Sequence, residues 1–153
     1  MRVRDNYLSD ELYLEFVNYS QECLYKYGER DDKGIPPVGM IHQLNLETHY
    51  LLPFPKKYGK FKLYRAYINC FAPGENPYFH IDDESGVTGL FYLTPWNTWD
   101  EHEGGETQLL IDNEIKGILP LPNRFFQFDA NIRHRATSFR NNHRFTLALK
   151  YGI

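Results

Sequence analysis

The chain has 153 residues, the usual size of one domain, and its net charge of -3 and pI near 6.1 provide no basic field for binding nucleic acid. Its two cysteines are too few for a disulfide framework, and no apolar stretch is long enough for a signal peptide or a membrane span. We therefore expect one cytoplasmic domain, residues 1–153, without a nucleic-acid or membrane partner.

The first 60 residues are expected to form a helical, supporting region. Ser9 is a suitable N-cap, and two acidic residues follow it in the first turn, where the helix dipole favours them. A helix over 9–27, ended by Gly28, would bury a stripe of residues at helical spacing: Leu12, Phe16, Tyr19, Cys23 and Tyr27. Residues 29–39 are rich in charge, proline and glycine, which predicts a loop.

From residue 61 the pattern changes to short strands, and the high aromatic content of 16% suits pleated surfaces. Turn residues separate eight predicted strands: 61–71, 77–82, 87–96, 107–111, 117–121, 124–129, 134–139 and 144–152. One helix followed by this series predicts a mainly β fold, either an antiparallel sandwich or a jelly roll.

The segment 77–82 carries the first candidate site residues. His80 and Asp82 are two positions apart, so on a strand they project from the same face, whereas Asp83 points to the other. His134 opens a later predicted strand and could supply a third ligand. Two histidines and one carboxylate leave open positions on a metal, as in non-haem Fe(II) oxygenases. A His-x-Asp pair alone is often not a metal site, so the interpretation depends on companion motifs.

Arg144 is the first companion of this set. Asn141 and Asn142 can form a tight hairpin turn, which would place Arg144 on the strand next to that of His134. Thr146 shares the face of Arg144. A guanidinium fork beside a hydroxyl is a good receptor for a carboxylate, although an arginine on a hairpin can equally be an exposed surface residue.

The chain resembles the 2-oxoglutarate/Fe(II)-dependent dioxygenases over about residues 63–152. Four motifs occur in the order and spacing of that family: His80-x-Asp82, Gly104-Gly105-Glu106-Thr107, His134 and Arg144-Phe145-Thr146. The segment LFYLTPWNTWDEHEGGETQLL at 90–110 is similar to the prolyl hydroxylase-like branch. Residues 1–60 carry no motif that matches the family.

The resemblance implies a double-stranded β-helix, a cupin-like jelly roll, with a catalytic core at 61–153. It implies that the two histidines and Asp82 hold Fe(II), and that Arg144 binds the distal carboxylate of 2-oxoglutarate. Tyr92 and Thr146 match positions whose hydroxyls assist, although Tyr92 can equally be a core residue. One departure is Phe71, which stands where many relatives have a tyrosine in the cofactor pocket.

The activity that the resemblance implies is hydroxylation of a prolyl residue in a protein or peptide. O2 would be consumed, and 2-oxoglutarate would be converted to succinate and CO2. Three alternatives remain open: a hydroxylase of a free amino acid or other small molecule, a non-catalytic jelly-roll module that has kept a metal, and a nucleic-acid repair oxygenase. The composition lacks the basic face that the last would need, apart from the segment 133–135. Both a monomer and a dimer are compatible with the sequence.

Overall fold

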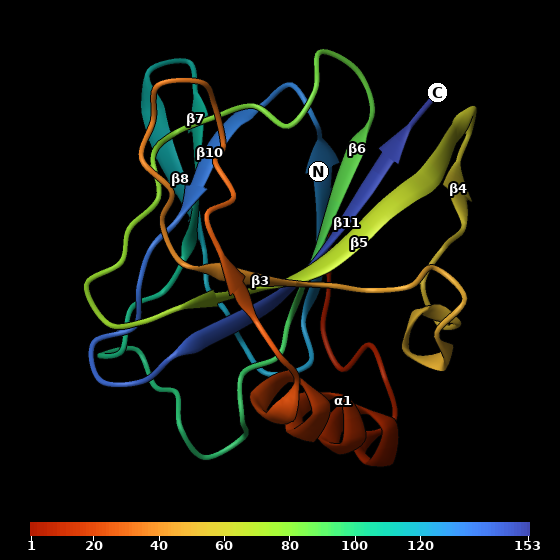
Figure 1. Cartoon of the computed structure of the whole chain (residues 1–153), viewed down its shortest axis with the longest axis vertical. Helices are drawn as coiled ribbons and strands as arrows, with labels where there is room; N and C mark the ends of the chain where they lie inside the picture. Colours follow the sequence, from red (N-terminus) through yellow and green to blue (C-terminus); the bar gives the residue numbers. More distant parts are fainter.

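The computed structural model describes all 153 residues, Met1–Ile153, as one α-helix, one 3-10 helix and eleven strands in two antiparallel sheets (Figure 1). The large sheet has the order β1 (Arg2–Arg4), β9 (Phe125–Asp129), β6 (Val87–Tyr92), β11 (Arg144–Gly152), β5 (Phe61–Phe71), β3 (Met40–Gln43) and β2 (Lys26–Tyr27), with β4 (Lys57–Tyr58) beside β5. The small sheet has the order β10 (Arg133–Ala136), β7 (Thr107–Ile111) and β8 (Glu114–Ile118). No helix combines the length and the apolar character that crossing a membrane requires.

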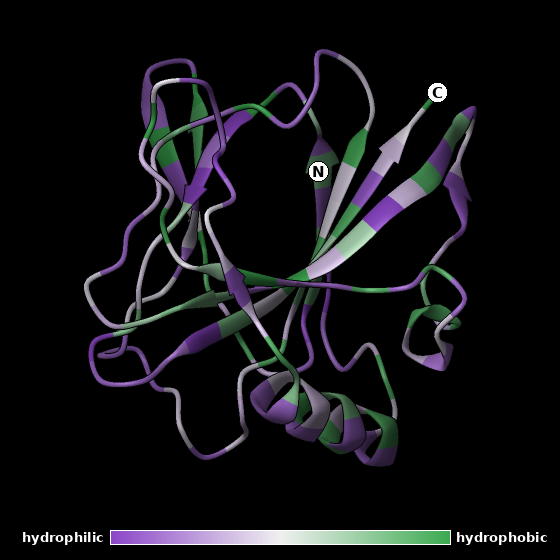
Figure 2. Ribbon diagram, in the orientation of Figure 1, coloured by the Kyte–Doolittle hydropathy of each residue, from purple (hydrophilic) through white to green (hydrophobic).

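The core divides into two clusters because strand side chains alternate between the faces of the large sheet. Residues of one face pack with α1 (Asp10–Glu22) and with the short helix η1 (His49–Leu51), which contribute Phe16, Val17, Tyr50 and Leu51 to the larger cluster. Residues of the other face pack against the small sheet. In Figure 1, α1 lies below the strands and the small sheet lies at the upper left, and Figure 2 shows the alternation as bands of colour along β5.

The predicted N-terminal helix is confirmed, but it ends earlier than expected. Ser9 is the N-cap, and its Oγ accepts a hydrogen bond from the Leu12 amide at 3.3 Å. The helix ends at Glu22, because the chain turns to extended geometry at Cys23 and enters β2 four residues after α1 ends. The predicted bounds of 9–27 were therefore wrong at the C-terminal end.

The buried stripe of α1 also differs from the expectation. Its fully buried residues are Tyr13, Phe16, Val17 and Ser20, which follow the i, i+3, i+4, i+7 spacing of one helix face. Leu12 and Tyr19 pack only at the edge of the core, and Tyr27 lies on a strand and is exposed. Phe16 of the predicted stripe is therefore confirmed, whereas its other members lie beside the core face or beyond the end of the helix.

Three strand predictions, at 61–71, 107–111 and 144–152, match the observed bounds. The predicted strand 117–121 is displaced, because β8 covers Glu114–Ile118. The segment 77–82 forms no regular strand and pairs only through an isolated bridge between His80 and His134. Residues 1–60 contribute four strands to the large sheet as well as α1, which the expectation of a helical region did not include. The loop prediction for 29–39 is confirmed.

The expected hairpin between His134 and Arg144 is wrong. β10 pairs with β7 in the small sheet, whereas β11 lies between β5 and β6 in the large sheet. The connection 137–143 therefore crosses from one sheet to the other, and His134 and Arg144 belong to opposite layers.

Candidate active site

The two histidines of the candidate site are joined through their backbones. The His80 amide donates to the His134 carbonyl at 3.0 Å, and the reverse bond is 2.9 Å. Each Nδ1 faces a backbone carbonyl two residues earlier, that of Tyr78 at 3.0 Å and that of Ile132 at 2.8 Å. Nδ1 is therefore the protonated nitrogen in each ring, and the lone pair of each Nε2 is free for a metal ion.

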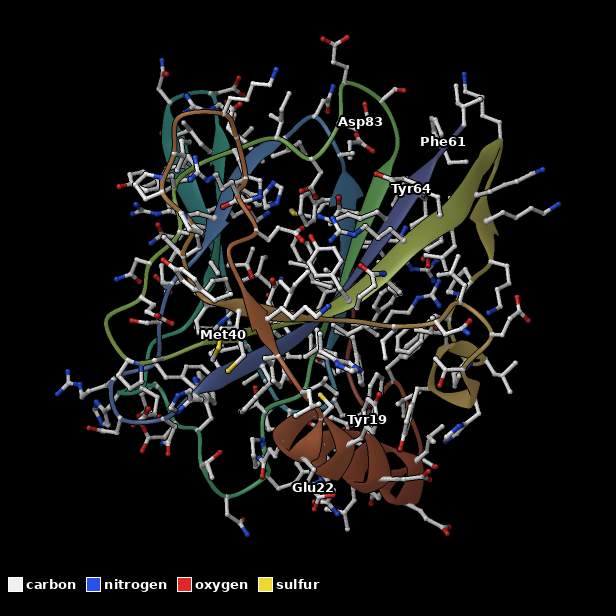
Figure 3. All side chains as sticks on the ribbon, in the orientation of Figure 1. Tyr19, Glu22, Met40, Phe61, Tyr64 and Asp83 are labelled. Carbon is white, nitrogen blue, oxygen red and sulfur yellow. The ribbon has the colours of Figure 1, made fainter.

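Asp82 completes the group. Its Oδ1 lies 3.5 Å from Nε2 of His80, and its Oδ2 lies 3.5 Å from Nε2 of His134. The three ligand atoms all lie within 4.8 Å of one another. The Asp82 amide donates to the Ala130 carbonyl at 3.0 Å, so backbone pairing, rather than a regular strand, fixes the aspartate. Asp83 is exposed in the loop before β6, where Figure 3 labels it, and is not part of the group.

The protonation states of Asp82 and His134 suit a cation. Burial by itself lowers the pKa of His80, but the carboxylates of Asp82 and Asp31 outweigh burial and raise it. Burial by itself raises the pKa of Asp82, but the Lys150 ammonium and the two histidines outweigh burial and lower it well below its usual range. Burial lowers the pKa of His134 to about 4, with His80 and Lys150 acting in the same direction. His134 is therefore neutral and Asp82 ionised near pH 7, which are the forms that bind metals.

Arg144 is buried, with 2% of its surface exposed, and it donates hydrogen bonds in three directions. Nε reaches the Gly105 carbonyl at 2.8 Å, Nη1 reaches Thr146 Oγ1 at 2.9 Å, and Nη2 reaches Thr107 Oγ1 at 3.1 Å. All three acceptors are neutral, and Arg144 forms no ion pair within the chain. A buried guanidinium without a counter-ion is costly, so the site favours an anionic ligand.

Gly105 is required for this arrangement. Its φ is +80°, a conformation that side chains other than glycine rarely adopt, and a Cβ there would overlap the ring of Phe139. The glycine therefore allows the backbone carbonyl to turn towards Arg144 while the aromatic ring packs behind it.

Tyr92 enters the same hydrogen-bond network indirectly. Its hydroxyl donates to Thr107 Oγ1 at 2.7 Å, and its ring centroid lies 5.5 Å from Cζ of Arg144. Tyr92 is completely buried and does not line the cavity, whereas Thr107 and Thr146 do. Contacts of Tyr92 and Thr146 with a cofactor stay predictions.

One cavity between the two sheets joins these groups. Its walls include the two histidines, Arg144 and three alternate residues of β5, which are Tyr67, Asn69 and Phe71. A second cavity shares His80, Tyr67 and Lys150 with the first and is also lined by Asp82. It reaches the surface beside the exposed Tyr64, whose ring Figure 3 shows on β5. The site thus combines a cavity that contains the Arg144 guanidinium, the group of metal-binding character, and a second cavity that reaches the surface.

The sequence interpretation missed three residues that face these cavities: Thr107, Lys150 and Asp31. Thr107 is the last residue of the Gly-Gly-Glu-Thr motif, and Lys150 continues the alternate series that begins with Arg144 and Thr146. Strand periodicity could therefore have indicated Lys150. Asp31 lies on the loop 29–39, and no sequence signal places it 3.5 Å from the His80 ring nitrogen.

Fold and site together define a class of β-sheet protein with a two-histidine, one-carboxylate group beside a buried arginine, and solved structures share this fold. A Pseudomonas putida prolyl-4-hydroxylase matches with a TM-score of 0.76 and 14% identity, over 99% of this chain and 92% of that one. A Trichoplax adhaerens prolyl hydroxylase in complex with a hypoxia inducible factor peptide matches with a TM-score of 0.71 and 19% identity, over 98% and 82%.

A third similar structure is the viral collagen prolyl hydroxylase of Paramecium Bursaria Chlorella virus-1, in its 2-oxoglutarate complex. It matches with a TM-score of 0.71 and 17% identity, over 98% of this chain and 94% of that one. No protein-family model and no curated protein sequence matches the chain. At these identities the structural likeness establishes a shared fold.

Proposed function

We propose that the protein is an Fe(II)/2-oxoglutarate-dependent dioxygenase that hydroxylates a prolyl residue in a protein or peptide. Its two sheets would form a double-stranded β-helix, a cupin-like jelly roll, with residues 61–153 as the catalytic core and 1–60 as a supporting region. The observation that carries the proposal is the buried, unpaired guanidinium of Arg144 in the same cavity as His80 and His134.

His80, Asp82 and His134 fit a divalent metal. Both imidazoles present Nε2 because Nδ1 is held by a backbone carbonyl, and a donor set of two nitrogens and one carboxylate oxygen suits Fe(II). When bound, Fe(II) would supply the O2 chemistry that converts 2-oxoglutarate to succinate and CO2 and adds a hydroxyl group to the substrate.

Arg144 would hold the distal carboxylate of 2-oxoglutarate. Three of the five N–H groups of a guanidinium are used by Gly105, Thr107 and Thr146, which leaves two for the ligand. The hydroxyl of Thr146 can donate to the same carboxylate, because it accepts from Nη1 and keeps its own proton free. Burial excludes water from this ion pair and strengthens it.

The substrate would approach through the second cavity, which Asp82 and Tyr64 help to line. Tyr64 and Ile81 are exposed at its rim and offer an aromatic and an apolar surface to a peptide. Two of the three similar structures described above are named for a peptide complex or for collagen, which supports a peptide substrate.

A free amino acid is the second candidate substrate. The same cavity is lined by charges of both signs, including Glu29, Asp31 and Arg65, and a zwitterion could pair with both. A prolyl residue inside a peptide has neither an N–H group nor a charge of its own, so the two candidates make different demands on these side chains.

The test that needs no substrate is spectroscopic. Anaerobic addition of Fe(II) and then 2-oxoglutarate to the metal-free protein should produce a visible charge-transfer band, and His80→Ala should abolish it. Succinate release would then be measured with prolyl peptides and with L-proline. Metal binding without the band would favour a non-catalytic module and overturn the role of Arg144.

A further inference from the structure

A second buried cation lies beside the candidate metal group. Lys150 is only 7% exposed, and its Nζ contacts Oδ2 of Asp82. It is the direct cross-strand neighbour of Thr88 on β6, and the Thr88 hydroxyl donates to the same oxygen. One oxygen of Asp82 is therefore held by an ammonium group and a hydroxyl.

Asp82 is the only carboxylate within ion-pair distance of Lys150. Asp31, the next acidic residue of the cavity, lies beside the ring of His80 and forms no ion pair with the ammonium group. Tyr67 is another neighbour of Lys150, and Nζ of the lysine lies over its aromatic ring at 5.8 Å from the ring centroid. The buried charge of Lys150 thus depends on the same aspartate that a metal would need.

We propose that Lys150 is a resident cation of the metal site. It balances the charge of Asp82 in the metal-free protein, leaves Oδ1 as the free oxygen, and weakens the binding of a divalent metal. The inference rests on the metal site of the proposed function and adds a positioning residue that controls metal affinity.

The physical reason is that two cations would share one carboxylate. A divalent ion and the Lys150 ammonium repel each other across Asp82, and this repulsion is strong at short range in a partly buried site. The dianion 2-oxoglutarate would offset the repulsion. We therefore expect 2-oxoglutarate to tighten metal binding by a larger factor in the wild-type protein than in a variant without the charge.

Two changes of opposite direction distinguish this role from simple packing. In Lys150→Met, Asp82 loses its buried partner, so the melting temperature of the metal-free protein should fall by roughly 5–10 °C. The affinity for a divalent metal should rise by about tenfold or more, because the repulsion is removed. A residue that only supports the fold would lower both quantities.

The experiment uses Co(II) as the probe. The full-length protein is titrated with Co(II), binding is followed by its visible absorption with and without 2-oxoglutarate, and thermal unfolding is measured without metal. Lys150→Arg keeps the charge and should keep both wild-type values. Thr88→Val removes the neutral donor to the same oxygen and should change the Co(II) affinity by about threefold or less.

Wild-type protein that binds no Co(II) would overturn the metal site and the proposed function together. Wild-type binding with an equal or weaker affinity in Lys150→Met would overturn the resident-cation role alone. Should that variant fail to fold, Lys150→Gln, which keeps a polar donor but no charge, is expected to bind Co(II) more tightly, and weaker binding would contradict the inference.

Discussion

The two faces of β11 show how one strand serves two purposes. Residues 145, 147, 149 and 151 point towards α1 and are all apolar or aromatic. Residues 144, 146, 148 and 150 point between the sheets, where Arg144 and Lys150 are buried beside Thr146. Apolar packing of the first face holds β11 in the sheet. The second face can therefore hold charged side chains away from water.

The polar face itself contains two unlike cations. Lys150 is paired with Asp82 inside the chain, whereas Arg144 has only neutral acceptors. A buried charge without a partner lowers stability until a ligand supplies one. The two ends therefore differ: the Arg144 end lacks a counter-ion, whereas the charge at the Lys150 end is already balanced by a carboxylate of the candidate metal group.

The largest effect on metal binding and turnover is expected from a substitution in the small sheet, the layer opposite β11. His134→Ala removes a metal ligand, so metal binding and turnover should be lost. Co(II) titration and succinate release would measure this. His143→Ala, which changes an exposed histidine just before β11, is the matched control and should retain both properties. Full activity in His134→Ala would contradict the assignment of the site.

The next largest effect is expected on 2-oxoglutarate binding, from a substitution on the polar face of β11. Arg144→Ala should weaken 2-oxoglutarate binding by about 2–5 kcal/mol, because it removes one partner of a buried charge pair, while metal binding is retained. Titration of 2-oxoglutarate into the metal-loaded protein would test this. Arg140→Ala, at an exposed position of the preceding connection, serves as the control. An unchanged affinity in Arg144→Ala would move the carboxylate receptor elsewhere.

A substitution on the apolar face should affect stability and leave the site intact. Leu147 is fully buried under α1, so Leu147→Ala should cost about 2–5 kcal/mol of unfolding free energy in a denaturant titration. Its Co(II) affinity should stay at the wild-type value. Leu14→Ala, on the exposed side of α1, should change stability by less than about 0.5 kcal/mol. A change of Co(II) affinity in Leu147→Ala would show that the two faces are not independent.

The smallest effect on stability is expected where an arginine is paired with a half-exposed aspartate. Arg124 Nε lies 2.6 Å from Asp5 Oδ1, and the aspartate is half exposed. Asp5→Asn should cost about 0.2–1 kcal/mol at neutral pH. The hydrogen bond from Arg124 lowers the pKa of Asp5, so this contribution is present above the unfolded pKa and lost as pH falls through the folded pKa. Stability curves of both proteins should therefore converge in acid.

The sequence could predict the parts of the fold that depend on local periodicity. Strand alternation placed Arg144 and Thr146 on one face, and the N-cap at Ser9 marked the start of the helix. The end of α1 was missed because residues 23–27 keep a helical pattern of apolar residues while pairing of β2 with β3 draws them into extended geometry. Tertiary pairing overrides local propensity at such a boundary.

By itself, the sequence determined that His80 and Asp82 are neighbours, that Arg144 and Thr146 share a face, and that two glycines precede Thr107. Only the tertiary structure decided that β10 and β11 lie in different sheets, so that His134 and Arg144 line one cavity from opposite layers. It also decided that Lys150 meets Asp82. The physical reason is that local sequence sets the direction of each side chain, whereas the sheet that a strand joins depends on hydrogen bonds and packing with segments far away in the chain.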